Sequence, residues 1–178
     1  MNDDTIIQLQ SEDGPVFEIK RRYCKNLKTI DNLLADIDPE LDGDNKVPPI
    51  PVPIRSSIMP VVIGYAEMFG EGEGKRPIPK KSNQLYFIAE DRRIFDNLND
   101  APDQHPSKFD LVIATNYLDF EAALWLALKS IANQIPQKNI EELKTFFGVS
   151  TEPFTVEEKA RCKEMFPFLL QEDLDAIS

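Results

Sequence analysis

The chain has 178 residues, of which 42% are hydrophobic, so it can build one domain with a real core. Its formal net charge is -11, from 31 acidic and 20 basic residues. Such an acidic surface repels phosphate backbones and anionic lipid head groups. We therefore expect neither nucleic acid nor a membrane as a partner.

The first elements expected are two strands joined by a turn. Asp13-Gly14 separates two short alternating runs, a pattern typical of a β-hairpin. Thr29 precedes apolar residues at helical spacing, which predicts a short helix from Ile30 to Ile37 capped by that threonine. The stretch "VPPIPVPI" must be extended, because three prolines alternate with apolar residues. It favours an edge strand over a proline-rich ligand.

The middle of the chain predicts a helix followed by a linker. Ser56 or Ser57 can cap a helix through "IMPVVIGYAEMF", with Pro60 in its first turn. The glycine-rich segment after it resembles a phosphate-binding loop only superficially, since Phe69 replaces the first glycine and Arg76 the Ser or Thr. We expect a flexible loop at about 70–84.

Two further helices lie in "KFDLVIATNYLDFEAALWLALKSIANQIP". The first starts at Pro106 or Ser107, and Asp119 is a candidate N-cap for the second, from Phe120 to Ile135, before Pro136. The apolar arc of the second helix is wider than one core-facing stripe requires. This width indicates that the helix covers two different surfaces.

The remaining sequence predicts two short helices. Asn139 with Glu142, and Thr155 with Glu158, have capping-box spacing, so helices should run to Phe147 and about Met165. Apolar and aromatic residues are crowded into this region. Short terminal helices bury each other incompletely, which favours an apolar groove for a partner.

Cysteine and histidine usage limits the chemistry. Cys24 and Cys162 have no metal-binding spacing, and His105 is the only histidine, so a multi-histidine metal site is excluded. The acidic stretch 36–44 lacks EF-hand spacing and reads as a solvated loop. We expect no catalytic residue, no metal and no cofactor. A Cys24-His105 hydrolase is the least favoured alternative.

We expect the protein to be localised in the cytoplasm and nucleus. The N-terminus lacks the basic and apolar regions of a signal peptide, and no run approaches the length of a membrane span. The unpaired cysteines suit a reducing compartment.

Several ordered blocks resemble the S-phase-kinase-associated (Skp) adaptor family of SCF ubiquitin ligases. These are "IIQLQSEDGPVFEI", "KTIDNLLADI", "ATNYLDFEAALWLALKSIANQI", "NIEELKTFFGV" and "PFTVEEKARCKE". The resemblance covers most of the chain and is weakest from Gly70 to Gln104. It implies an α/β, BTB/POZ-type fold over 1–136 and a C-terminal, F-box-binding pair of helices over 137–178.

The resemblance also implies a non-enzymatic adaptor that joins a cullin N-terminal domain to F-box proteins. Asn116 and Tyr117 match the family's cullin-facing pair. The positions that match its F-box-facing surface are Leu128, Ile131, Ile135, Phe147, Val149, Phe154 and Phe168. A homodimer is a further expectation for the chain without its partners. The alternative is a self-associating BTB-type or elongin-C-like module that binds a different receptor box.

Overall fold

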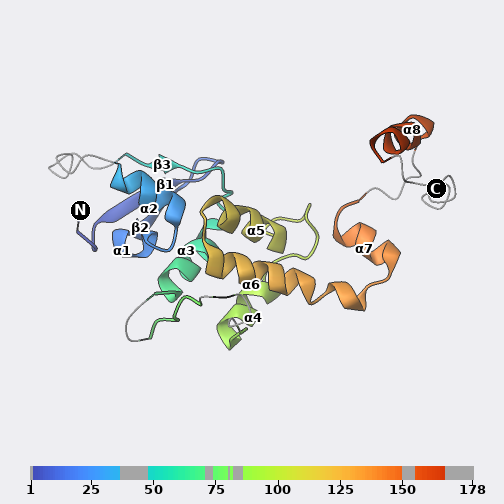
Figure 1. The fold of residues 1–178 in the computed structure, drawn as a ribbon. Coiled ribbons are helices and arrows are strands. Elements are labelled where there is room, and N and C mark those ends of the chain that lie inside the picture. Colours follow the sequence, from blue (N-terminus) through green and yellow to red (C-terminus); the bar gives the residue numbers. More distant parts are fainter. Residues whose placement is uncertain are drawn as a thin grey trace. The chain divides into compact units, whose positions relative to one another are not determined.

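The computed structural model describes residues 2–36, 48–70, 74–79, 81, 86–149 and 155–166 (Figure 1). The chain forms two compact units, residues 1–138 and 139–178, and each is described by itself. The expected solvated loop at 36–44 lies outside the described residues, except for Asp36. The expected flexible loop is described only at 70, 74–79 and 81.

The first unit opens with the predicted hairpin. β1 (Ile6–Gln10) pairs antiparallel with β2 (Val16–Lys20), with Ile7 opposite Ile19. Gly14 in the connecting turn has a φ of 104°, which favours glycine over other residues. Alternate residues of β1 point into the core, as period-two patterning requires.

The proline-rich stretch forms the predicted edge strand. β3 (Ile50–Pro51) pairs parallel with β1, so the strand order is β2-β1-β3. Ile50, Val52 and Ile54 are buried, while Pro51 and Pro53 are exposed. The prolines therefore face solvent, where their missing N–H costs little.

Among the described residues, two helices lie between β2 and β3, and the other helices follow β3. The first unit contains α1 (Arg21–Cys24), α2 (Lys28–Ala35), α3 (Met59–Met68), α4 (Ala89–Asp96), α5 (Lys108–Tyr117), α6 (Glu121–Ala132) and the 3-10 helix η3 (Ile135–Gln137). One core of buried apolar residues, extending from Ile7 to Ala127, holds it together. Figure 1 shows α5 and α6 side by side, and the two helices pack on each other.

Three predicted helix caps are wrong. α2 begins two residues earlier, after Leu27, and Thr29 lies within its first turn. α3 is preceded by Ile58 and has no side-chain cap, because the amide and hydroxyl of Ser56 instead donate to Asp13 in the hairpin turn. Asp119 lies in the left-handed region with a φ of 49°, and Phe120 is the N-cap of α6.

The predicted end of α6 is also wrong. The helix ends at Ala132 with Asn133 as its C-cap, and Ile135 belongs to η3 together with Pro136. The start of α5 is correct, because Ser107 is its N-cap and forms a capping box with Asp110.

A buried ion pair joins residues 74–79 to α4 within the first unit. Arg76 Nη1 lies 2.7 Å from Asp91 Oδ2 on α4, and the Asp91 side chain is completely buried. Asp91 Oδ2 also accepts from the amide of Ile88. Burial, together with the negative charge of Asp91, raises the pKa of Tyr65. This part of the glycine-rich segment is therefore anchored to α4.

The second unit contains the two predicted capping-box helices. α7 (Ile140–Phe146) starts at Asn139, whose side chain accepts from the amide of Glu142. α8 (Val156–Met165) starts at Thr155, which pairs with Glu158 in the same way. Gly148 ends α7 with a φ of 64°. No helix in the described part of the chain is long and apolar enough to cross a membrane.

Candidate partner-binding sites

The exposed face of α5 gathers the first candidate residues. Asn116 and Tyr117 are both exposed, and the Tyr117 side chain has an exposed fraction of 40%. Ile113, one turn earlier, is 63% exposed and shares their face because residues three and four apart are neighbours on a helix. The opposite face is buried through Leu111, Ala114 and Thr115. The site thus presents apolar area beside an amide and a hydroxyl.

The end of α5 is held by the start of α2. Thr29 Oγ1 donates to the carbonyl oxygen of Tyr117 at 2.7 Å, and the Thr29 amide donates to Leu118. Lys28 Nζ lies 3.5 Å from Asp119 Oδ2. These contacts fix the backbone that carries Asn116 and Tyr117, so the exposed face is preorganised.

A shallow groove of about 130 Å³ adjoins Ile113. Its apolar wall includes Pro53, Ile54 and Ile58, and its polar rim contains Glu12, Arg55 and Asp110. This groove lies where the loop after β3 meets α5. It extends the apolar area of the α5 face, and an inserted apolar side chain would be buried there.

Asp110 is the charged centre of this end of the groove. His105 Nδ1 lies 2.7 Å from Asp110 Oδ2, and the amide and hydroxyl of Ser107 donate to the same oxygen. Partial burial disfavours ionisation, but these hydrogen bonds outweigh it and lower the pKa of Asp110. Asp110 is therefore a fixed negative charge beside Ile113.

Sequence reasoning missed Ile113 as a site residue. The resemblance pointed to Asn116 and Tyr117 alone, but Ile113 also faces solvent. The signal that identifies it is the four-residue separation from Tyr117. Because the two residues lie on one face of the helix, exposure of Tyr117 favours exposure of Ile113.

The second candidate group lies along α6 and η3. Leu128 is 45% exposed and Ile135 is also exposed, whereas Ile131 is 7% exposed. Ala122, Ala123, Leu126 and Ala127 face the core. The wide apolar arc therefore covers the core on one side and presents Leu128 to solvent on the other. Ile131 contributes mainly to packing.

The remaining candidate residues belong to the second unit. Phe147 and Val149 are exposed at the end of α7, and the Phe147 ring packs edge-on against the buried Phe146 at 5.1 Å. Phe154 and Phe168 lie outside the described residues. Further exposed apolar residues, not predicted as site residues, are Ile140, Val156, Met165 and Phe166. The unit exposes much apolar surface for its size.

The groups considered for chemistry have other roles. Cys24 is buried, and burial raises the pKa of its thiol to about 11, which makes it a poor nucleophile at neutral pH. His105 is bound to Asp110. Among the described residues, no group of three or more His, Cys, Asp or Glu side chains could hold a metal ion.

Comparison with known proteins identifies the class of this fold. A model of the Skp1 family tetramerisation domain, a POZ domain, matches residues 5–69, and a model of the Skp1 family dimerisation domain matches residues 124–166. The small three-stranded sheet with packed helices is thus a BTB/POZ-type fold, followed by two C-terminal helices. The expected fold class is confirmed.

The chain belongs to the Skp1 family, as the sequence resemblance predicted. It is 30% identical over 161 residues to each of two Dictyostelium discoideum proteins, SCF ubiquitin ligase complex proteins SKP1a and SKP1b. Those alignments cover 90% of this chain and 93% of the relatives. It is also 26% identical over 160 residues to SKP1-like protein 14 of Arabidopsis thaliana, covering 89% and 92% of the two chains.

Proposed function

We propose that this chain is a non-enzymatic adaptor subunit of an SCF-type cullin–RING ubiquitin ligase. In this role it joins a cullin N-terminal domain to F-box proteins that select substrates for ubiquitin-dependent degradation. The observation that carries the proposal is similarity along nine-tenths of the chain to proteins named as SCF complex components. Adaptors work by binding two partners at once, so no catalytic group is required.

The cullin is assigned to the exposed α5 face, defined by Ile113, Asn116 and Tyr117. Tyr117 offers contact area and a hydrogen-bonding hydroxyl, the combination enriched in interface anchors. Ile113 supplies the adjoining apolar area. The fixed end of α5 supports this assignment, because a preorganised surface loses little entropy when it binds.

F-box proteins are assigned to Leu128 and Ile135, to Phe147 and Val149, and to Phe154 and Phe168. The four of these that are described are all exposed apolar residues. Ile131 belongs to the same assignment through the family resemblance, although it is 7% exposed. Exposed apolar side chains of this kind are what the apolar faces of amphipathic F-box helices would bury.

The test is co-expression of the chain with F-box segments and a cullin N-terminal domain, followed by size exclusion. A ternary peak supports the bridging role. Tyr117→Lys should weaken cullin binding about tenfold or more and leave F-box binding intact, because it places a charge in an apolar contact. Leu128→Asp should show the reverse pattern. It is a sharper probe than Ile131→Asp, since the burial of Ile131 would make that change destabilising.

The chain offers matched controls for both variants. Tyr86→Lys makes the same substitution at a tyrosine that is more exposed than Tyr117. Leu33→Asp places the same charge at a leucine with the same 45% exposure as Leu128, but on α2. Equal loss of both partners in a folded Tyr117→Lys variant would refute the assignment of two separable surfaces.

The second candidate is a self-associating module that binds a different receptor box. The extent of exposed apolar surface in the second unit favours self-association of the unbound chain. Sedimentation would distinguish the two functions. A tight homodimer that binds none of the F-box segments would support the alternative function. A dimer that dissociates when an F-box segment is added would support the adaptor function.

We further propose that the chain works in the cytoplasm and nucleus. Both cysteines are free, which suits a reducing compartment, and the proposed partners would have to be met there. Imaging of a fluorescent fusion protein in cells tests this localisation.

A further inference from the structure

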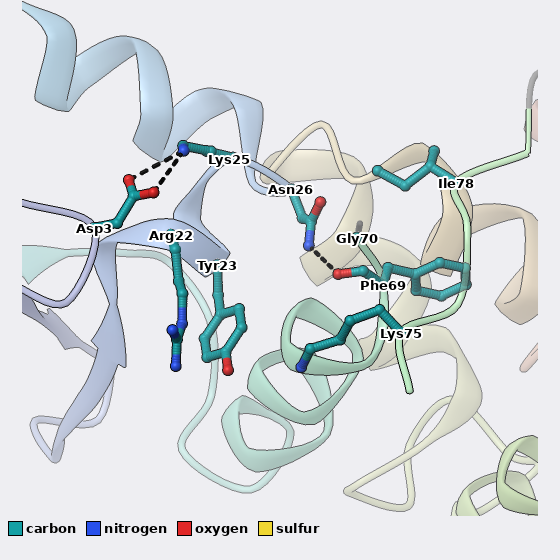
Figure 2. A pocket seen from close by; sticks show the side chains of 9 residues that line it. All are labelled: Asp3, Arg22, Tyr23, Lys25, Asn26, Phe69, Gly70, Lys75 and Ile78. Atoms are coloured by element: carbon teal, nitrogen blue, oxygen red, sulfur yellow. Dashed lines mark hydrogen bonds and ion pairs between the residues drawn. The ribbon is translucent and has the colours of Figure 1, made fainter. Parts of the chain in front are cut away.

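A cleft beside α1 shares no lining residue with the two candidate surfaces, the α5 face and the candidate F-box residues. It has a volume of about 530 Å³ and is lined by Arg22, Tyr23, Lys25, Asn26, Lys75 and Ile78, among others (Figure 2). The proposed function leaves this cleft without a role.

The cleft concentrates positive charge on an acidic protein. The Arg22 guanidinium lies 5.0 Å from the centre of the Tyr23 ring, and Lys75 Nζ lies 4.7 Å from it. Figure 2 shows Arg22 and Tyr23 extending in the same direction and Lys75 approaching from the other side, with the ring drawn between the two cations. Lys25 adds a third positive charge. A chain with a net charge of -11 thus brings three cationic side chains together in one cleft.

The chain's own N-terminal carboxylates already occupy these cations. Asp3 Oδ1 lies 3.0 Å from Lys25 Nζ, and Asp4 Oδ1 lies 3.4 Å from Arg22 Nη1. Each of these side chains is at least two-fifths exposed, and exposed ion pairs contribute little free energy. Two consecutive aspartates therefore show that peptide carboxylates fit Lys25 and Arg22, and the weakness of exposed pairs means that displacing them costs little.

The cleft also has a rigid apolar part. Asn26 Nδ2 donates to the carbonyl oxygens of Ala66 and Phe69 at 2.7 and 2.8 Å, which fixes the end of α3 against α1. Ile78 on the rim is half exposed. A ligand that combines carboxylates with an apolar side chain matches this lining better than a small inorganic anion does.

We propose that the cleft binds an acidic peptide segment of a partner protein that carries apolar residues among its carboxylates. Arg22, Lys25 and Lys75 pair with the carboxylates, and an apolar side chain packs on Ile78. In the free protein Asp3 and Asp4 act as an internal competitor. Binding replaces the ion pairs of Asp3 and Asp4 with ion pairs to the partner's carboxylates. The affinity for the partner therefore depends on the charge of residues 3 and 4.

The test is fluorescence anisotropy of the full chain with a labelled peptide of alternating Glu and Leu. The probe should bind, and raising the salt from about 50 to about 500 mM should weaken it strongly, because exposed charges are screened. Arg22→Glu and Lys75→Glu should each weaken binding about tenfold. Arg92→Glu, the same charge change at an exposed residue of α4, should leave binding unchanged within about twofold.

The internal competitor is tested by Asp3→Asn with Asp4→Asn. This variant should bind the peptide about threefold more tightly, since the pairs that compete with it are lost. A merely structural role for the two aspartates predicts no gain. Equal binding of a Gln-Leu peptide, or wild-type affinity of both folded charge-reversal variants, would overturn the proposal. Cullin and F-box binding are measured separately, so the adaptor proposal stands or fails independently.

Discussion

At the scale of single residues, the clearest energetic feature is the buried Asp91. Its carboxylate is completely buried, and Arg76 and the Ile88 amide share one oxygen, Oδ2. The other oxygen and the Tyr65 hydroxyl have no hydrogen-bond partner among the described residues. The ion pair with Arg76 is therefore the main interaction that offsets the desolvation cost of the Asp91 carboxylate.

Removing that carboxylate tests the arrangement. Asp91→Ala should lower the free energy of unfolding by about 3 kcal/mol, because Arg76 would keep its charge in a mostly buried position without a carboxylate to pair with. Arg92→Ala, at the next and exposed position of α4, should change it by less than about 0.5 kcal/mol. Urea denaturation measures both. A loss as small as that of the control would mean that water replaces the pair.

At the scale of elements, the hairpin turn and the segment before α3 form one unit through Asp13. Its carboxylate accepts from the amide and hydroxyl of Ser56, and these bonds lower the pKa of Asp13 to about 2. The amide of Glu12 donates to Ile54 nearby. The turn thus fixes the chain where it leaves the sheet.

This contact predicts a pH dependence. The folded-state pKa is below the ordinary value of 3.8, so the contribution of Asp13 is complete above about pH 4 and is lost as the pH falls through about 2. Wild type should therefore be more stable than Asp13→Asn at about pH 6, and the difference should shrink below about pH 3. Asp96→Asn on α4 serves as the exposed control. A difference that is constant with pH would contradict the contact.

The same residues explain which helix starts could be predicted. Ser107, Asn139 and Thr155 cap their helices through a partner three residues later, so the sequence alone contains both halves of each contact. Ser56 and Thr29 were predicted as caps and are not, because their hydroxyls donate to groups distant in sequence. Ser56 donates to Asp13, and Thr29 donates to the carbonyl oxygen of Tyr117. Local spacing cannot reveal a partner that only the fold brings near.

The candidate site likewise has features that local sequence could predict and features that depend on the fold. The position of Tyr117 on an exposed helix face was within reach of sequence reasoning, and so was the double role of α6. The groove beside Ile113 was not, because Pro53 and Ile58 reach α5 only through the parallel pairing of β3. The cleft at Tyr23 likewise depends on Lys75, which the fold returns to α1.

At the scale of the whole molecule, the two units differ in how they bury apolar surface. Every residue of the main core cluster belongs to the first unit. In the described part of the second unit, Phe146 is the buried apolar residue, while Phe147, Val149 and Val156 are exposed. The first unit therefore has the packing of an independent domain, and the second gains most from a partner.

Truncation after Lys138 tests this difference. The shortened chain should keep the melting transition of the first unit within about 5 °C, because the main core is unchanged. Under the adaptor proposal it should retain cullin binding and lose F-box binding by about a hundredfold or more. Circular dichroism and co-purification provide the two measurements. A truncated chain that fails to fold would show that the second unit supports the first.

The bond from Thr29 to the carbonyl oxygen of Tyr117 spans 88 residues of sequence. Contacts of such separation close a long loop and form only after both ends of that loop are present. On the ribosome, α2 emerges long before α5, so the exposed α5 face is completed late in synthesis. A nascent chain therefore cannot offer this surface to a partner until most of the first unit has left the exit tunnel.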